Sequence, residues 1–346
     1  MNLDVAALLG RSEWQAPCDR LRERYAGARV LVTGAAGSIG TEIGHRLVDL
    51  GAEQLICVDH HEPSLYRLGL DLGGADRVQL VLADARDSAR LGALLLHHRI
   101  DAVVHLAAYK HVPLGEANAD QVALVNIFST LDLARGAMRA GTRDFLYPST
   151  DKAVRPPSIY GCSKRLAEVG LRAAMVENSM RIRISRLVNV IGTAGNVIEV
   201  FARQIAAGQD LTITDERMTR YWMSRREAAD LLLLSAVARP GEVFLLNVGE
   251  AVPLVETARR LAMSMGVTIL RTRSIGARPG ERLQEHLAYS WESRVPTDIK
   301  GIDALVGERA HSGFRRGLAA LRRNARSGDS VATRAEIDRL IAQVGR

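Results

Sequence analysis

The sequence predicts an α/β fold in which a doubly wound parallel sheet is followed by a smaller α/β unit. Two observations support this prediction. Short β-rich apolar runs alternate with helical patterns over the first half of the chain, and a glycine-rich loop joins the first run to the first helix. Strands that alternate with helices in this way form parallel sheets with both faces covered.

Each element of the first half has a local signal. The first helix, for example, stops at Gly51, and glycine is a common helix terminator. Hydrophobic periodicity predicts strands at 29–33, 55–59, 78–84, 101–107, 145–149 and 181–190, and helices at 38–50, 63–72, 87–98, 119–140 and 158–178.

Beyond residue 190 the elements are less regularly spaced. Periodicity predicts helices at 196–207, 225–238 and 253–265, and strands near 211–214, 220–223, 243–248 and 267–272. We expect the strand at 243–248 to return to the first sheet. The chain then divides into an N-terminal arm (1–27), a first domain (28–190), a smaller domain (191–300) and a basic helical tail (301–346).

The charge balance does not favour a nucleic-acid partner. The chain has 46 basic and 39 acidic side chains, so the net charge is 46 − 39 = +7. Nine arginines and five acids follow Gly301, so the tail supplies +4 of this charge and the rest is close to neutral. No helix-turn-helix, zinc-finger spacing or aromatic–basic interleaving accompanies it, which favours a solvated tail. The basic residues are 42 Arg and four Lys: Lys110, Lys152, Lys164 and Lys300.

Cysteine usage and hydropathy indicate a cytoplasmic protein. Three widely separated cysteines do not form a disulfide framework and fit a reducing compartment. No uncharged apolar run approaches the ~18 residues that a membrane span needs. We expect no membrane span, no signal peptide and no metal site.

The loop Gly34–Gly40 predicts a dinucleotide site of the Rossmann type. Gly34, Gly37 and Gly40 allow a tight turn and close approach to a pyrophosphate, while Ser38 and Ile39 open the following helix. Asp59 ends the second strand, where a carboxylate binds the adenosine ribose and favours NAD.

Two more predictions concern the cofactor. His60 and His61 follow Asp59 and leave NADP possible. Asp84, at the end of the third strand, either reaches the adenine or caps the next helix. Ala107, at the end of the fourth strand, is also expected at the cofactor.

The stretch after the fifth strand predicts oxidation of an alcohol. Tyr160 and Lys164 are four residues apart, so they share one face of a helix. An ammonium beside a phenol lowers the phenol pKa and lets it accept a hydroxyl proton during hydride transfer to a nicotinamide.

With these motifs the chain resembles the extended short-chain dehydrogenase/reductases. Within that family it is most similar to the polysaccharide-biosynthesis group of UDP-N-acetylglucosamine 4,6-dehydratases. The resemblance covers about residues 29–287. It rests on these motifs: TGAAGSIG (33–40), KHVP (110–113), STDKAV (149–154), YGCSK (160–164), NVIG (189–192), GNVIEVF (195–201), MTRYWM (218–223) and RPGERL (278–283).

The resemblance implies a lyase that uses bound NAD(H) and regenerates it in each cycle. Tyr160 would take the C4 hydroxyl proton while Thr150 binds the C4 oxygen. Lys152 would remove the C5 proton, and Asp151 would protonate the departing C6 oxygen. The hydride then returns to C6 and gives a UDP-4-keto-6-deoxy sugar. As a base, Lys152 needs a lowered pKa, which burial beside Lys164 would provide.

The resemblance also implies that residues 28–190 bind NAD and residues 191–300 bind the UDP-sugar. Asn189, Arg220, Arg278 and Glu281 would contact the nucleotide part of the substrate. Lys110 and His111 lie at the carboxyl edge of the sheet, where they either bind substrate or pack against the cofactor. Helices 119–140 and 158–178 pair between subunits in relatives, so a homo-oligomer is expected.

Some features depart from the family pattern or leave alternatives open. Tyr109 stands where many relatives have a smaller aliphatic residue, and Arg155 replaces the usual Asn. Tyr160 resembles short members that invert C5, whereas LLGR (8–11) and Asp59 resemble long members that retain it. An NAD-dependent UDP-sugar epimerase and a non-catalytic dinucleotide sensor are the alternative functions, and intact Asp151–Lys152 argues against the first.

Overall fold

The computed structural model describes residues 4–73, 76–175, 179–267, 271–276, 280–307 and 314–345. Its centre is a sheet of nine strands in the order β14-β15-β11-β6-β5-β4-β1-β2-β3. The strands are β1 (Arg29–Thr33), β2 (Gln54–Asp59), β3 (Val78–Leu82), β4 (Ala102–His105), β5 (Asp144–Thr150), β6 (Arg181–Leu187), β11 (Val243–Leu246), β14 (Ser293–Pro296) and β15 (Ile302–Val306).

The sheet is parallel from β3 to β11 because each of these strands enters after a helix that crosses its face. β11 lies beside β6, with Val243 opposite Ile184. β15 then pairs antiparallel with β11 on one side and with β14 on the other. The doubly wound α/β prediction is confirmed.

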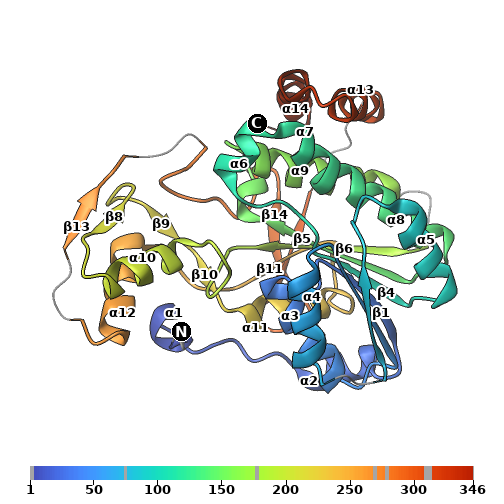
Figure 1. The fold of residues 1–346 in the computed structure, drawn as a ribbon, viewed down its shortest axis with the longest axis horizontal. Coiled ribbons are helices and arrows are strands. Elements are labelled where there is room, and N and C mark those ends of the chain that lie inside the picture. Colours follow the sequence, from blue (N-terminus) through green and yellow to red (C-terminus); the bar gives the residue numbers. More distant parts are fainter. Residues whose placement is uncertain are drawn as a thin grey trace.

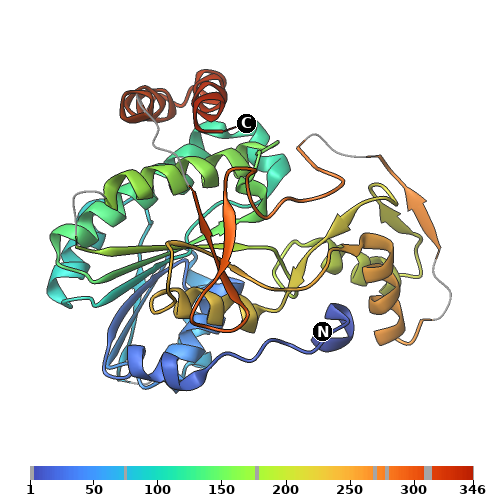
Figure 2. The same ribbon diagram turned by 180° about the vertical axis from the view of Figure 1, so that it is seen from behind.

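Helices cover both faces of the sheet (Figures 1 and 2). Each face has its own apolar cluster, so the central strands are buried on both sides and have nearly continuous apolar sequences, whereas the outermost strands β3 and β14 are largely exposed. The helices on one face are α5 (Ser88–His97), α8 (Thr130–Arg139) and α9 (Ile159–Met175); those on the other are α2 (Cys18–Tyr25), α3 (Ser38–Asp49), α4 (Glu62–Asp71) and α11 (Arg225–Ser235).

The helix predicted at 119–140 is not uniform. It begins as α7 (Ala119–Val122), widens into a π-helix, η1 (Ala123–Ser129), and continues as α8. The short helix α6 (Val112–Ala117) precedes it. Asn126 lies inside η1, and π-helical turns are frequent at functional sites.

The smaller unit has its own apolar cluster, which includes Leu8 and Leu9 of the N-terminal helix α1 (Val5–Leu9). The arm therefore contacts both units, because α2 packs on the main sheet. The remaining elements of this unit are α10 (Val197–Ala206), α12 (Leu254–Ser264), β7 (Asn189–Val190), β8 (Leu211–Ile213), β9 (Thr219–Arg220), β10 (Trp222–Met223), β12 (Val252–Pro253) and β13 (Thr272–Ser274).

Two predictions in the C-terminal part were wrong. The expected strand at 267–272 is instead β13, which starts at Thr272, and residues 268–270 lie outside the described ranges. The tail was expected to be helical from residue 301, but Ile302–Val306 forms β15. Its alternating apolar residues pair with β11, and β14 completes this edge of the sheet.

The rest of the tail is a pair of helices, α13 (Phe314–Arg326) and α14 (Ser330–Val344), that pack on α7, η1 and α9. Arg322 binds Asp132 of α8 at 2.8 Å, and Arg165 donates to the Val344 carbonyl. The helices expected to pair with a second copy are therefore covered here by the chain itself.

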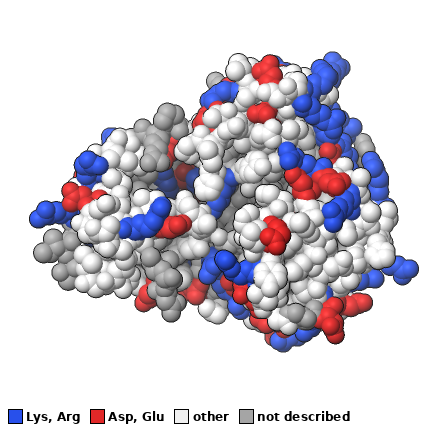
Figure 3. Space-filling view, in the orientation of Figure 1, with Lys and Arg blue, Asp and Glu red and all other residues white. Residues whose placement is uncertain are grey.

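Basic side chains gather over these C-terminal helices, at the upper right of Figure 3. Exposed Arg316, Arg323 and Arg326 contribute to this surface. No helix within the described ranges combines the length and apolar character that crossing a bilayer requires.

Candidate active site

The glycine loop between β1 and α3 is a turn that side chains would obstruct. Gly34 has a φ of +66°, and a Cβ there would lie 2.7 Å from the Ala107 amide nitrogen. A Cβ at Gly40 would lie 2.4 Å from the Gly34 carbonyl oxygen. The glycines therefore leave the loop backbone uncovered by side chains at the carboxyl edge of the sheet. The backbone amides of the first turn of α3, which have no partner within the helix, lie next to it.

A cavity of about 310 Å³ lies against this loop. Five of the predicted cofactor residues line it: Gly34, Gly37, Asp59, Asp84 and Ala107. Ser38, Ile39 and Gly40 form the first turn of α3. Backbone that approaches a ligand closely, a helix N-terminus and an acid at the end of β2 are what a bound dinucleotide requires. The residues present therefore fit NAD.

The two acids of this cavity are held differently. Asp59 is buried and accepts the Ala36 and His61 amides, each at 3.0 Å, so its carboxylate is fixed to the glycine loop. Asp84 pairs with Arg86 at 2.6 Å, and that hydrogen bond lowers the pKa of Asp84. The next helix is capped by Asp87, so the capping interpretation of Asp84 was wrong.

The predicted catalytic residues gather where β5 ends in a short 3₁₀ turn, η2 (Asp151–Ala153). The Thr150 hydroxyl donates to Asp151 Oδ1 at 2.9 Å. Lys152 Nζ donates to the same oxygen at 3.0 Å and to Asn189 Oδ1 at 3.2 Å. Asp151 is completely buried, and its Oδ2 atom lacks a hydrogen-bond partner among the described residues. Tyr160 stands in the first turn of α9.

The electrostatics of Lys152 differ from the prediction. Burial lowers the pKa of Lys152, but the negative charges of Asp151 and Glu285 outweigh it and the pKa lies above the ordinary lysine value. We expected the positive charge of Lys164 to add to the effect of burial, but among the described residues Lys164 is not one of the charges that act on Lys152. Lys152 is therefore an ammonium at neutral pH.

The lowered lysine pKa belongs to Lys164. Its ammonium donates to the Pro148 carbonyl at 2.7 Å and lies 4.3 Å from the centre of the Tyr147 ring. Burial lowers the pKa of Lys164 to about 7, despite the opposing charge of Glu168.

The prediction for Tyr160 also needs correction. Burial and the negative charge of Asp151 raise the pKa of Tyr160, although the ammonium of Lys152 and the Thr150 hydroxyl act against them. The cation that acts on this phenol is therefore Lys152, not Lys164 as the four-residue spacing suggested. The phenol and the Asp151–Lys152 pair are electrostatically coupled.

The residues predicted to bind substrate lie in two places. Asn189 contacts Lys152 directly, and Arg220 lies 3.9 Å from Glu285 in the same cluster. Lys110 Nζ donates to the Ala194 carbonyl at 2.8 Å, and the His111 ring lies against Gly195. Lys110 and His111 therefore join the first domain to the turn at 194–195.

The last two predicted substrate residues come from the RPGE motif. Glu281 follows Gly280, where a Cβ would lie 3.1 Å from the Ser158 side chain, so this segment approaches the start of α9. Arg278 lies outside the described residues.

Two buried residues of the site were not predicted. Glu285 forms an ion pair with Lys152 at 3.5 Å. Asn126, from η1, accepts the Tyr109 amide at 2.8 Å and donates to Ser163 of α9 at 2.9 Å, which fixes the loop after β4 to α9. Glu285 follows the RPGERL motif by two residues, the only signal that could have suggested it.

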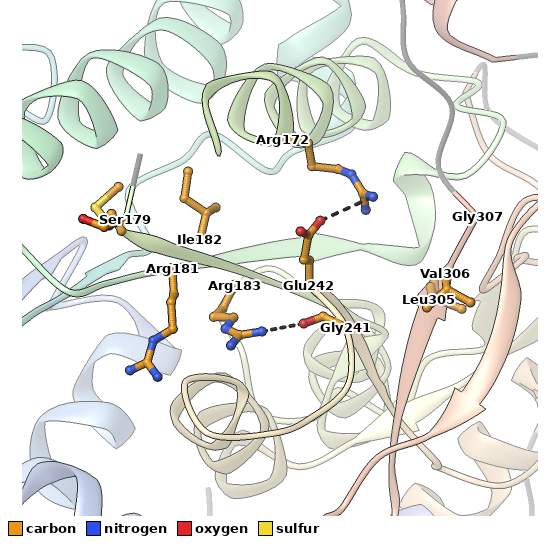
Figure 4. Close-up of a pocket in the computed structure, with 11 residues that line it drawn as sticks. Arg172, Ser179, Arg181, Ile182, Arg183, Gly241, Glu242, Leu305, Val306 and Gly307 are labelled. Carbon is orange, nitrogen blue, oxygen red and sulfur yellow. Dashed lines mark hydrogen bonds and ion pairs between the residues drawn. The ribbon is translucent and has the colours of Figure 1, made fainter. Parts of the chain in front are cut away.

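A second, larger cavity of about 600 Å³ lies at the opposite edge of the sheet, at the start of β6. Its charged side chains do not converge. Figure 4 shows Arg181 and Arg183 on one side of β6, and Arg172 with Glu242 on the other. Arg172 binds Glu242 at 3.4 Å and Arg181 binds Asp144 at 2.7 Å, so most of this charge is already neutralised. The chemistry is concentrated at the carboxyl edge.

Known proteins share both the sequence and the fold. The model of a family described as "Polysaccharide biosynthesis protein" matches residues 30–306. A protein named "Probable polysaccharide biosynthesis protein EpsC" from Bacillus subtilis is 35% identical over 293 residues, which are 82% of this chain and 49% of that protein. The chain thus spans about half the length of that relative.

Two further matches are more specific in name. A "UDP-N-acetylglucosamine 4,6-dehydratase (inverting)" from Campylobacter jejuni is 28% identical over 295 residues, 81% of this chain and 86% of that protein. The crystal structure of DesIV, a dTDP-glucose 4,6-dehydratase from Streptomyces venezuelae with NAD and TYD bound, superposes with a TM-score of 0.67 at 25% identity and covers 75% of this chain and 88% of that one. The chain belongs to the polysaccharide biosynthesis protein family, within the extended short-chain dehydrogenase/reductases.

Proposed function

We propose that the protein is a UDP-N-acetylglucosamine 4,6-dehydratase, or acts on a closely related UDP-hexose. The observation that carries the proposal is the ion pair between Asp151 and Lys152, held at 3.0 Å beside Thr150 and Tyr160. A sugar epimerase needs only the tyrosine and a hydroxyl. An acid and a base side by side are what the additional removal of water requires.

Gly34, Gly37, Asp59 and Ala107 would hold the cofactor, for which we propose NAD. Bound NAD supplies the hydride acceptor for C4 of the sugar and the hydride donor for C6. The chain supplies the proton chemistry. Tyr160 takes the proton of the C4 hydroxyl as its phenolate, the form that the Lys152 ammonium favours. Thr150 hydrogen-bonds the C4 oxygen, and Lys152 and Asp151 carry out the elimination.

The ion pair explains how a lysine with a raised pKa can act as the base. Transfer of one proton from Lys152 Nζ to Asp151 Oδ1, 3.0 Å away, turns the charged pair into a neutral amine and a neutral acid. The amine then removes the C5 proton while the acid protonates the C6 oxygen, so the C5–H and C6–O bonds break and water leaves. Both groups end charged as they began. When the hydride returns to C6, the Lys152 ammonium, whose protons exchange with solvent, returns a proton to C5, and the proton that Tyr160 took from C4 restores the ammonium.

We further propose that the smaller unit, with Arg220 and Glu281, receives the UDP part of the substrate. Figure 3 shows the surface hollowed between the two units, with basic side chains in the hollow. A homo-oligomer also stays a proposal. Because α13 and α14 pack on α7, η1 and α9, the parts of the expected pairing helices that they cover would not be available to a second copy.

Mass spectrometry tests the proposed function directly. Incubation of the NAD-loaded protein with UDP-N-acetylglucosamine, without added reductant, should give a product lighter by one water. In D₂O the product should carry deuterium at C5, and its NMR spectrum would give the configuration there. An isomer of unchanged mass would indicate an epimerase instead. Tight binding of both ligands with an unchanged substrate would indicate a non-catalytic sensor.

Cofactor preference gives a second test. The buried carboxylate of Asp59 should repel the extra phosphate of NADP, so we expect NAD⁺ to bind at least about tenfold more tightly than NADP⁺. Replacement Asp59→Asn removes the charge and should reduce this ratio, since His60 and His61 lie beside it. Calorimetric titration with both dinucleotides measures the ratio. An equal preference in the unmodified protein would show that Asp59 does not select the cofactor.

A further inference from the structure

Glu285 lies in the catalytic cluster although no motif includes it. Its side chain is only 4% exposed, with Oε1 lying 3.5 Å from Lys152 Nζ and 3.9 Å from Arg220 Nε. Its second oxygen, Oε2, is buried and lacks a hydrogen-bond partner among the described residues. A buried carboxylate is costly unless its charge is compensated, so its place beside two cations requires an explanation.

The acceptors around Lys152 provide one. An ammonium group has three protons, and three side-chain oxygens from separate segments lie around this one. Asp151 is in the turn after β5, Asn189 opens β7, and Glu285 comes from the segment after residue 280. We propose that Glu285 is a positioning residue for the dehydration, the carboxylate that completes this cage and ties Lys152 to the proposed nucleotide-binding Arg220.

The charges that face Lys152 show what Glu285 adds. Asp151 and Glu285 are negative, Arg220 is positive, and the Tyr160 phenol is a further titratable group. The guanidinium of Arg282 also interacts with both carboxylates. Asp151 alone would face an excess of positive charge, so the second carboxylate compensates part of that excess and strengthens the hold on the ammonium.

This cage has a functional consequence that rests on the proposed function. The elimination uses a proton that passes between Lys152 and Asp151 and must not be lost between turnovers. By favouring the ammonium, Glu285 retains that proton on the pair.

The scarcity of lysine makes a direct test possible. The rate of acetylation at each of the four lysines can be followed separately by peptide mass spectrometry as the pH is varied, with exposed Lys300 as the internal reference. In Glu285→Gln, which keeps the shape and one acceptor oxygen, we expect the labelling midpoint of Lys152 to fall by about one pH unit. The midpoints of Lys164 and Lys300 should not change.

Glu199→Gln is the matched control, because Glu199 acts on Lys110 and not on Lys152. It should move the midpoint of Lys110 alone. A Lys152 midpoint that is the same in folded Glu285→Gln and in the unmodified protein would overturn the proposal. If that variant does not fold, Glu285→Asp takes its place. Its shorter side chain moves the carboxylate away from Lys152, so the labelling midpoint of Lys152 must still fall.

The labelling experiment requires no turnover, so it separates the two proposals. A shifted Lys152 midpoint together with no loss of water from UDP-N-acetylglucosamine would reject the proposed function and keep the cage. Normal dehydration together with an unshifted midpoint would reject the role of Glu285 and keep the proposed function.

Discussion

Lys152→Ala is expected to lose dehydration of UDP-N-acetylglucosamine by about 10²- to 10⁴-fold, the usual contribution of a general base, while it still binds NAD. The reason is that the substitution removes the only amine in contact with Asp151 among the described residues. The cofactor loop and its cavity involve none of the atoms that are lost. The measurement is the initial rate of water loss by mass spectrometry, alongside a calorimetric titration with NAD⁺.

Two further variants distinguish the role of Lys152 as a base from the effect of its positive charge. Lys152→Arg keeps the positive charge beside Asp151 but cannot give up a proton at working pH, so its rate should be as low as that of Lys152→Ala. Lys300→Ala removes an exposed lysine and should retain the normal rate. Near-normal dehydration by Lys152→Arg would mean that the base lies elsewhere.

Arg186→Met is expected to lower the free energy of unfolding by about 3–5 kcal/mol, the cost of leaving buried charges without a partner. Arg186 is completely enclosed and binds Glu168 and Glu292, with distances from 2.6 to 2.9 Å. Arg165 would still compensate Glu168, but Glu292 would lose its ion pair with Arg186. Urea denaturation monitored by circular dichroism measures the change.

The same network predicts an acid dependence. Burial raises the pKa of Glu168, but Arg186 and Arg165 outweigh it and the pKa falls to about 2, below the ordinary value of 4.5. The stability that this carboxylate provides is therefore present above pH 4.5 and is lost as the pH falls toward 2. In Arg186→Met the loss should begin at a higher pH.

Two controls identify the cause. Adding Glu168→Gln to Arg186→Met removes one of the charges and should recover part of the stability. Arg294→Met breaks an ion pair with Asp303 at the surface, so it should cost less than about 1 kcal/mol. Equal effects of Arg186→Met and Arg294→Met would contradict the importance of burial.

The sheet and the glycine loop could be predicted from the sequence because their signals are local. Alternating apolar runs define parallel strands, and Gly34 and Gly40 mark a turn that excludes side chains. The strands β14 and β15 escaped prediction, since four- and five-residue strands carry little periodicity; β15 owes its place to pairing with β11, and β14 to pairing with β15.

The electrostatics of the site could not be predicted in the same way. Tyr160 and Lys164 do share a helix, but the cation that acts on the phenol is Lys152, from a different element. Whether a lysine pKa rises or falls depends on which distant side chains surround it. Glu285 is more than 130 residues away from Lys152 along the chain, and sequence spacing carries no information about such a contact.

The place of the tail also determines when this protein can fold during its synthesis. The sheet joins β1, which starts at residue 29, to β15, which ends at residue 306, and α13 and α14 complete the apolar cluster over α9. Pairings between distant segments form slowly, because loop closure must precede the contacts that reward it. The sheet therefore cannot be completed until β15 has left the ribosome, and until α14 follows it the part of α9 on which α14 packs lacks that partner.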